Sequence, residues 1–190
     1  MDLPRIILAS ASPRRVELLR KLKLRFDVQP ADVVEVHSDH LTAREVCQVN
    51  AYRKARAIAK CQPNALVLAA DTLVHLDNRL FGKPANLAEA RRMLKRLAGR
   101  THEVVTGVCL MRLHPHACIT FEVGTDVTFR KLTAQEIDRY LAAINPLDKA
   151  GAYAIQEFGD WIVERIEGSF TNVVGLPIER LQLELASWSA

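Results

Sequence analysis

The sequence is poor in cysteine and in long apolar runs. Its four cysteines, at positions 47, 61, 109 and 118, form no C-x-x-C pair and no spacing typical of zinc sites, so nothing supports a metal-binding or redox framework. The N-terminal apolar run is far too short for a signal peptide, and no stretch approaches the roughly 18 apolar residues of a membrane span. We therefore expect a cytoplasmic protein with reduced thiols and no membrane partner.

What the chain does have is the composition of a globular protein. Its 190 residues are 49% hydrophobic and 25% charged, which suits one domain over residues 1–190 with a well-buried core. Lysine and arginine number 26 against 22 acidic residues, a net charge of +4 that fits an anionic ligand. The basic residues are scattered along the chain, which argues against nucleic acid as a partner.

Helix-like and strand-like segments alternate along the chain. Expected helices begin at Ser12 and at three capping boxes, Thr42 with Glu45, Asn86 with Glu89 and Thr133 with Glu136, and a last helix begins near Pro177. Expected strands lie at 6–9, 26–28, 65–71, 72–76, 79–81, 101–130 with a break at Pro115, and 161–166, with a hairpin turn at Asp77-Asn78. This order predicts an α/β fold, a mixed twisted sheet flanked by helices.

The stretch "SASPRRVELLRKL", residues 10–22, combines a good helix start with an oddity. Ser12 is a favourable N-cap and Pro13 a favourable first helical residue. Arg14 and Arg15 then fill the first turn, although a helix N-terminus already carries about half a positive charge. A strand, a short loop and a helix start make the local geometry of many phosphate sites.

Two acidic residues are candidates for chemistry. Asp71 directly follows six apolar residues of an expected buried strand, where an unpaired carboxylate is costly, so we expect it at the end of the strand facing a cleft. Spacing alone equally allows Asp71 to cap a turn. Glu35, in an expected loop, reads by itself as a solvated charge. The neighbouring His37 and His40 would need a framework that places them on one face to bind a metal, and we assign them no role.

Lys54 and Lys83 have different local contexts. Lys54 reads as part of a solvated helix face, whereas "GKP" at 82–84 places Lys83 on a constrained loop from which an ammonium group could reach a phosphate. The tract is not a Walker loop, because Pro84 follows Lys83 and Asp77 stands where that motif has its first glycine. The tract "GSFTNVVGLP" at 168–177 reads by itself as a structural turn.

Taken together, these segments resemble the Maf family of nucleoside triphosphate pyrophosphatases. The resemblance spans nearly the whole chain, and its S-x-S-P-R-R opening is very specific. One departure is Asn50, which stands where the family often has leucine. The matching segments are "LASASPRRVELL" at 8–19, "RKARA" at 53–57, "AADTLV" at 69–74, "GKP" at 82–84, "GRTHEVVTGV" at 99–108, "DKAGAYAIQ" at 148–156 and "GSFTNVVGLP" at 168–177.

The resemblance implies an activity and an architecture. The activity is hydrolysis between the α- and β-phosphates of a nucleoside triphosphate, which gives the monophosphate and pyrophosphate, with a divalent metal cation, Mg²⁺ or Mn²⁺, as cofactor. The architecture is similar to that of the inosine triphosphate pyrophosphatases, with a central cleft between two lobes. A homodimer is also expected.

By match to the family motifs, the resemblance assigns roles to individual residues. Asp71 is expected as the catalytic proton acceptor, and Glu35 and Asp71 as metal ligands; the sequence leaves open whether Asp71 is base, ligand or both. The expected phosphate-binding residues are Ser10, Ser12, Arg14, Arg15, Lys54 and Lys83. The expected specificity residues are Arg14, Thr72 and Gln156.

These residue types suit the chemistry. Mg²⁺ usually binds through one or two carboxylates plus phosphate oxygens, and phosphoryl chemistry needs positioning and charge neutralisation. The segment "DKAGAYAIQ" is similar to the subgroup that hydrolyses dTTP and UTP, and the Gln156 amide suits the O4/N3–H edge of uracil or thymine. The alternatives are the 7-methyl-GTP subgroup, which typically carries a "CAGSF"-like segment here, and a non-catalytic nucleotide-sensing regulator of cell division.

Overall fold

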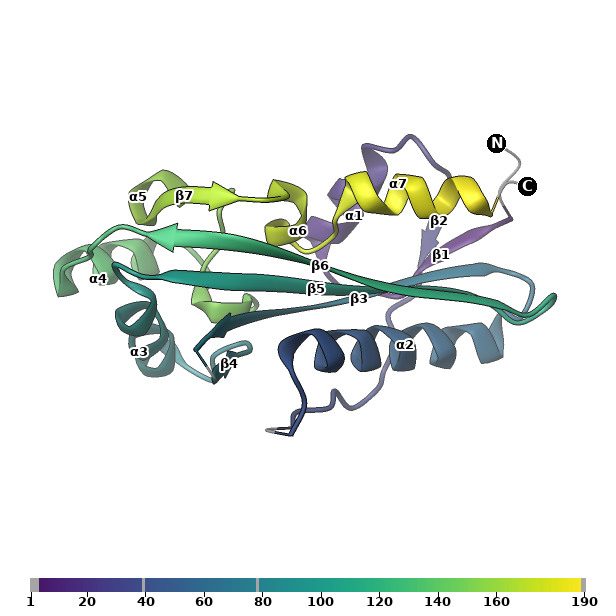
Figure 1. Ribbon diagram of the computed structural model, residues 1–190, viewed down its shortest axis with the longest axis horizontal. Helices are drawn as coiled ribbons and strands as arrows, with labels where there is room; N and C mark the ends of the chain where they lie inside the picture. Colours follow the sequence, from purple (N-terminus) through teal and green to yellow (C-terminus); the bar gives the residue numbers. More distant parts are fainter. Residues whose placement is uncertain (1–3, 39, 78, 189–190) are drawn as a thin grey trace. The chain divides into compact units, whose positions relative to one another are not determined.

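The computed structural model of the protein describes residues 4–38, 40–77 and 79–188. Its strands form one sheet in the order β2-β1-β3-β5-β6-β7, with β4 paired to β3 (Figure 1). The strands are β1 (Ile6–Leu8), β2 (Phe26–Val28), β3 (Leu66–Leu76), β4 (Arg79–Phe81), β5 (Thr101–Arg112), β6 (Ala117–Phe129) and β7 (Val163–Glu167). The helices are α1 (Pro13–Arg20), α2 (Ala43–Cys61), α3 (Leu87–Leu97), α4 (Ala134–Ala143), the 3-10 turn η1 (Ala150–Ala152), α5 (Gly159–Ile162), α6 (Phe170–Val174) and α7 (Ile178–Ser187).

The pairing of the strands confirms the expected mixed α/β fold. Strand β1 pairs in parallel with β2 and β3, whereas β3 with β4 and β6 with β7 are antiparallel. The chain forms two compact units: unit 1 comprises Met1–Asp71, Thr106–Val123 and Gly175–Ala190, and unit 2 comprises Thr72–Val105 and Gly124–Val174. None of the helices in the described ranges is long and apolar enough to cross a membrane.

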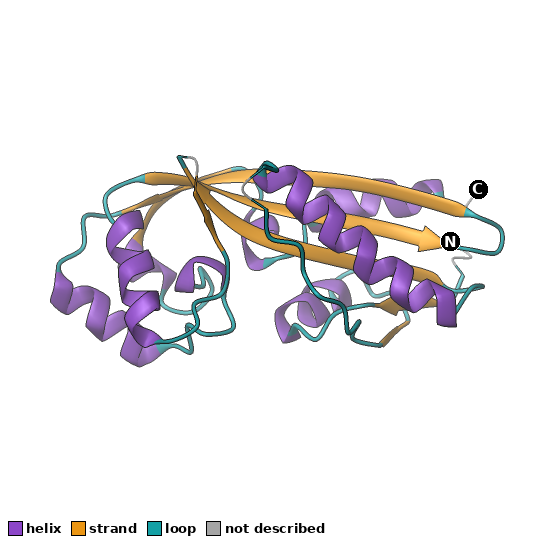
Figure 2. Ribbon diagram, turned by 90° about the horizontal axis from the view of Figure 1, so that it is seen from below, coloured by secondary structure: helices purple, strands orange, loops and turns teal. Residues whose placement is uncertain are grey.

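Helix α2 covers one face of the strands of unit 1, and α1 and α7 lie on the opposite face (Figures 1 and 2). The α2 side is filled by small and aliphatic side chains, among them Ala51, Ala55 and Ile58 from the helix and Cys109 from β5. Helix and strand approach so closely at Gly107 that a Cβ there would lie 2.5 Å from the Cys47 carbonyl carbon. Glycine at this position therefore lets α2, which carries the candidate site residue Lys54, lie directly on the sheet.

Unit 2 has its own apolar core. Strand β3 and β4 form a hairpin, and the amphipathic helices α3 and α4 bury their apolar faces, including Leu94, Leu97 and Ile137, in one cluster with Phe129 of β6. The turn η1 packs against α3 in the same unit. The His102 ring lies edge-on to the rings of Phe129 and Tyr153 inside this cluster.

The predicted helix starts are confirmed. Thr42 and Thr133 each cap a helix in a complete capping box with the glutamate three residues later. The Ser12 side chain accepts from the backbone of the third helical residue, as an N-cap does. Asn86 caps α3 in the same way, although the Glu89 carboxylate accepts from the Ala85 N–H rather than from the cap residue itself.

Two predicted boundaries are wrong. Asp71 does not end a strand, because β3 continues to Leu76, with Leu73 and Val74 buried and Val74 paired with Phe81 of β4. The strand expected from Trp161 begins only at β7, because the residues before it close the short helix α5. Asn78 of the predicted hairpin turn lies outside the described residues.

Candidate functional site

Asp71 is the most buried carboxylate of a cluster in unit 1. It lies within β3 after six buried apolar residues and is itself 6% exposed. A charge at such a position is costly unless its oxygens are bound. Lys54 Nζ lies 2.7 Å from Asp71 Oδ1, and Asn50 Nδ2 donates to Asp71 Oδ2 over 3.0 Å. Both carboxylate oxygens are therefore held in fixed directions by two residues of one helix.

Lys54 joins the two acidic residues that the sequence singled out. Its Nζ also lies 2.6 Å from Glu35 Oε1, so one ammonium group bridges two carboxylates from separate parts of the chain. The side chains of Lys54 and Asp71 are 12% and 8% exposed, whereas that of Glu35 is 36% exposed. The solvated helix face expected for Lys54 alone is therefore wrong, and the cluster opens to solvent on the Glu35 side.

Asn50 is a member of the cluster that sequence reasoning missed. It is 1% exposed and lies one helical turn before Lys54, on the same side of α2. Its side chain accepts from the Val36 N–H over 2.7 Å and donates to the Val36 carbonyl over 3.2 Å as well as to Asp71. A polar residue in place of the family's frequent leucine, on a helix with a buried face, was the signal that could have found it.

The segment between β1 and α1 is built around Ser10. The side chain of Ser10 is buried and accepts from the Ser12 N–H over 3.2 Å. Arg15 donates from Nε to the Gly175 carbonyl over 2.8 Å and from NH1 to the Ala70 carbonyl over 2.9 Å. Arg15 thereby ties the start of α1 to the residue directly before Asp71.

The electrostatics at Arg15 are those of a cation held inside the protein. Burial lowers the pKa of Arg15, and the nearby Asp71 acts in the opposite direction. Arg14, the other arginine of the first turn, is half-buried. The positive charges at the α1 N-terminus therefore lie in the same unit as the carboxylates, and the Asp71 charge acts on Arg15.

Three residues expected at the site belong to unit 2. Thr72 follows Asp71 in β3 and is half-buried, whereas Lys83, after β4, and Gln156, after η1, are exposed. Within unit 1, Arg15 Nη1 also donates to Ser10 Oγ over 3.5 Å, and Lys54 joins Glu35 to Asp71. None of the hydrogen bonds described for unit 1 includes Thr72, Lys83 or Gln156.

The donor set fits a cation that arrives with a phosphate ligand. Among the described residues, no three His, Cys, Asp or Glu side chains are grouped as a metal site. His37 and His40 are both exposed. Glu35 and Asp71 offer two carboxylates, and Mg²⁺ needs only one or two from the protein when phosphate oxygens and water complete its shell.

Comparison with known proteins agrees with the resemblance read from the motifs. The sequence model of the family described as Maf-like protein matches residues 5–188. A "dTTP/UTP pyrophosphatase" of Bacillus mycoides (strain KBAB4) is 45% identical over 186 residues, which cover 98% of this chain and 96% of that protein. Proteins of the same name from Bacillus cytotoxicus and Bacillus cereus (strain AH187) are 45% and 44% identical over 98% and 97% of this chain. The chain belongs to the Maf-like protein family.

Proposed function

We propose that this protein is a nucleoside triphosphate pyrophosphatase that hydrolyses dTTP and UTP to the monophosphate and pyrophosphate. The observation that carries the proposal is the bridge from Glu35 through Lys54 to the buried Asp71. A site that only held an anion would gain nothing from two carboxylates, because they repel phosphate. The names of the relatives supply the substrates.

Asp71 is the proposed catalytic residue. Asn50 and Lys54 fix its two oxygens, so the carboxylate is oriented before a substrate arrives. Such a group can orient or deprotonate the attacking water, a contribution of about 10²- to 10⁴-fold. Lys54, 2.7 Å from Asp71 Oδ1, places a positive charge directly beside the carboxylate.

Glu35 and Asp71 are the proposed ligands of a divalent cation, Mg²⁺ or Mn²⁺. Bound there with the triphosphate, the cation would neutralise charge on the phosphate oxygens. Glu35 is the more exposed of the two carboxylates, which leaves one of its sides open to an incoming ion. Lys54 holds the two carboxylates together in the absence of that charge.

The phosphate chain is proposed to meet the α1 N-terminus. Ser10, Ser12 and the first N–H groups of α1 form a strand-to-helix turn of the kind that binds phosphate. Arg14, Arg15, Lys54 and Lys83 complete the proposed phosphate-binding set. Arg14, Thr72 and Gln156 are the proposed specificity residues, with the Gln156 amide pairing the O4/N3–H edge of the base.

The remaining proposals concern the domain organisation, the oligomeric state and the cellular location of the protein. We propose that residues 1–190 act as one catalytic domain, that the protein is a homodimer, and that it works in the cytoplasm. The cysteines at 47, 61, 109 and 118 are free thiols, which suits a reducing compartment. Size-exclusion chromatography with light scattering tests the dimer directly.

The decisive experiment is pyrophosphate release from a panel of nucleotides with Mg²⁺ or Mn²⁺. We expect dTTP and UTP to be the best substrates, Asp71→Asn to lower kcat by about 10³-fold or more while nucleotide affinity is kept, and Asp148→Asn to change little. Asp148 is the matched control, because it is also a carboxylate bound to a lysine but is exposed. Preference for 7-methyl-GTP would overturn the subgroup, and turnover of no triphosphate would favour a nucleotide-sensing regulator.

A further inference from the structure

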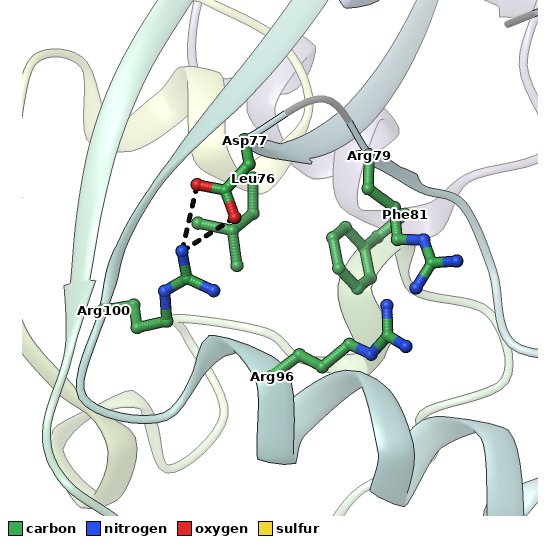
Figure 3. Close-up of a pocket in the computed structure, with 6 residues that line it drawn as sticks. All are labelled: Leu76, Asp77, Arg79, Phe81, Arg96 and Arg100. Atoms are coloured by element: carbon green, nitrogen blue, oxygen red, sulfur yellow. Dashed lines mark hydrogen bonds and ion pairs between the residues drawn. The ribbon is translucent and has the colours of Figure 1, made fainter.

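A pocket of about 300 Å³ lies in unit 2 and shares no residue with the candidate site (Figure 3). It is formed where the β3–β4 hairpin, the last turn of α3 and the residue before β5 meet. Its volume is at the lower end of the range for small-molecule sites. The residues that line it are Leu76, Asp77, Arg79, Phe81, Arg96 and Arg100.

The charges in this pocket do not balance. Arg100 is matched, because its Nη2 donates to both Asp77 oxygens over 2.9 and 2.7 Å. The guanidinium groups of Arg79 and Arg96 have no ion-pair or hydrogen-bond partner among the described residues. Figure 3 shows their guanidinium groups extending toward one another beside the Phe81 ring. Two positive charges therefore face the pocket with no anion between them.

Local structure explains only part of this arrangement. Arg96 lies in the last turn of α3, where the helix dipole favours a cation. Arg79 begins β4 and has no such reason to lie beside it. Like charges that share a pocket repel each other, so an anion that bridges them would remove an unfavourable contact and add charge-assisted hydrogen bonds.

The pocket also has an apolar wall. Leu76 and Phe81 are 6% and 4% exposed, so their side chains are held in place by the core of unit 2. Guanidinium groups bind phosphate through two parallel hydrogen bonds, and two unmatched arginines equal the charge of one phosphate monoester. Only a small part of the Leu76 and Phe81 side chains reaches the pocket surface, so the charge of the arginines, and not this wall, selects the ligand.

We propose that this pocket binds a phosphate monoester. The phosphate lies between Arg79 and Arg96. Arg100, held by Asp77, closes the opposite side. The proposal does not depend on the proposed pyrophosphatase activity, because no residue of the pocket takes part in it.

The experiment is a titration of the full-length protein with phenyl phosphate, followed by NMR of the arginine Nε–Hε groups. The Arg79 and Arg96 signals, assigned through Arg79→Ala and Arg96→Ala, are expected to shift with saturation at millimolar or lower concentration. Each variant is expected to weaken binding at the other arginine by about tenfold or more. All these side chains are exposed, so the variants should fold.

Arg92→Ala is the matched control, because Arg92 is an exposed arginine of the same helix that does not line the pocket. It removes the same charge and should leave binding within about twofold of the unmodified protein. Shifts that do not saturate, equal losses in Arg92→Ala, or equal binding of the singly charged phenyl sulfate would overturn the proposal. So would preferential binding of single-stranded DNA through the same arginines. Hydrolysis of dTTP should be unchanged in all three variants, which separates this proposal from the proposed function.

Discussion

Each unit of the protein holds a lysine between two carboxylates, and the two arrangements differ in what surrounds them. Lys54 of unit 1 contacts Glu35 and Asp71, which come from a loop and from a buried strand. Lys149 of unit 2 is more buried, at 4%, but its partners Asp148 and Glu157 are 47% and 39% exposed. In unit 1 a buried carboxylate depends on the lysine for its counter-charge, whereas in unit 2 a buried lysine depends on two exposed carboxylates.

The two lysines also differ in what their removal would leave behind. Lys149 Nζ also donates to the Asn145 carbonyl over 2.8 Å, four residues earlier, so it closes a local loop after α4. Without Lys149, water can reach both carboxylates. Without Lys54, the Asp71 carboxylate would lie in a buried strand with only the Asn50 amide bound to it and Arg15 nearby. Burial of the carboxylate, and not of the lysine, therefore distinguishes the candidate cluster of unit 1 from the lysine cluster of unit 2.

The largest expected effect comes from replacing each lysine in turn. Lys54→Met should lower kcat/KM for dTTP by about 10³-fold, because it removes the cation that orients Asp71 and faces phosphate. Lys149→Met should leave kcat/KM within about threefold and lower the free energy of unfolding by about 1–3 kcal/mol, because the Asn145 carbonyl loses its hydrogen bond to a charged donor. Pyrophosphate release and urea unfolding measure the two quantities. Equal losses of activity would contradict the comparison.

Buried asparagines give a second matched pair. Asn50 of unit 1 bonds Asp71 and the Val36 backbone, whereas Asn172 of unit 2 donates to the Val104 carbonyl and to Thr125 Oγ1. Asn50→Leu should lower kcat by about 10- to 100-fold, because Asp71 loses one of its two fixed directions. Asn172→Leu should destabilise the protein by about 1–3 kcal/mol with kcat unchanged in the folded fraction.

The Asn50 result needs a measurement that a purely structural role would not move. Because Asn50 also holds the backbone next to Glu35, Asn50→Leu should raise the metal concentration required for half-maximal activity, while Asn172→Leu should not. The pH profile of kcat should also change in the Asn50 variant and not in the Asn172 variant, because Asn50 contacts Asp71 and Asn172 does not. An Asn50 variant with a normal metal dependence and pH profile would reduce its role to packing.

The sequence predicted the elements better than it predicted the cluster. Caps at Ser12, Thr42 and Thr133 are local signals, because the cap and its partner lie three residues apart, and all three begin helices. The continuation of β3 past Asp71 was missed because it depends on pairing with β4 and on two bound carboxylate oxygens.

The same reason explains what was missed at the site. The contacts of Lys54 span 17 and 19 residues, and nothing local distinguishes such a lysine from a solvated one. The family resemblance predicted Lys54 but not Asn50, because this chain departs from the usual leucine at that position. The bonds of the buried Asn50 amide to Asp71 and to the Val36 backbone identify it as a member of the cluster.

Acid should also distinguish the two units. Burial lowers the pKa of His102 in unit 2 from 6.5 to about 4, and the ring bonds Tyr153 over 2.8 Å. Since the unfolded state binds the proton more readily, this stabilisation is complete above pH 6.5 and is lost as the pH falls toward 4, by about 3 kcal/mol. Hydrogen exchange should show unit 2 opening as the pH falls through this range, and His102→Gln should remove that dependence. If His102→Gln kept the same pH dependence of hydrogen exchange in unit 2, the assignment of that dependence to His102 would be wrong.

The smallest expected effect tests how locally each helix is held. Thr42 caps α2, which carries Asn50 and Lys54 of the proposed catalytic cluster, and Thr133 caps α4, which carries none of its residues. Thr42→Ala and Thr133→Ala should each cost about 1 kcal/mol, measured by urea unfolding. Asn50 lies two helical turns beyond Thr42, and cap loss frays only the first turn, so kcat/KM should stay within about twofold in both variants. A larger loss of activity in Thr42→Ala alone would mean that Asn50 and Lys54 depend on the start of α2 and not only on its packing at Gly107.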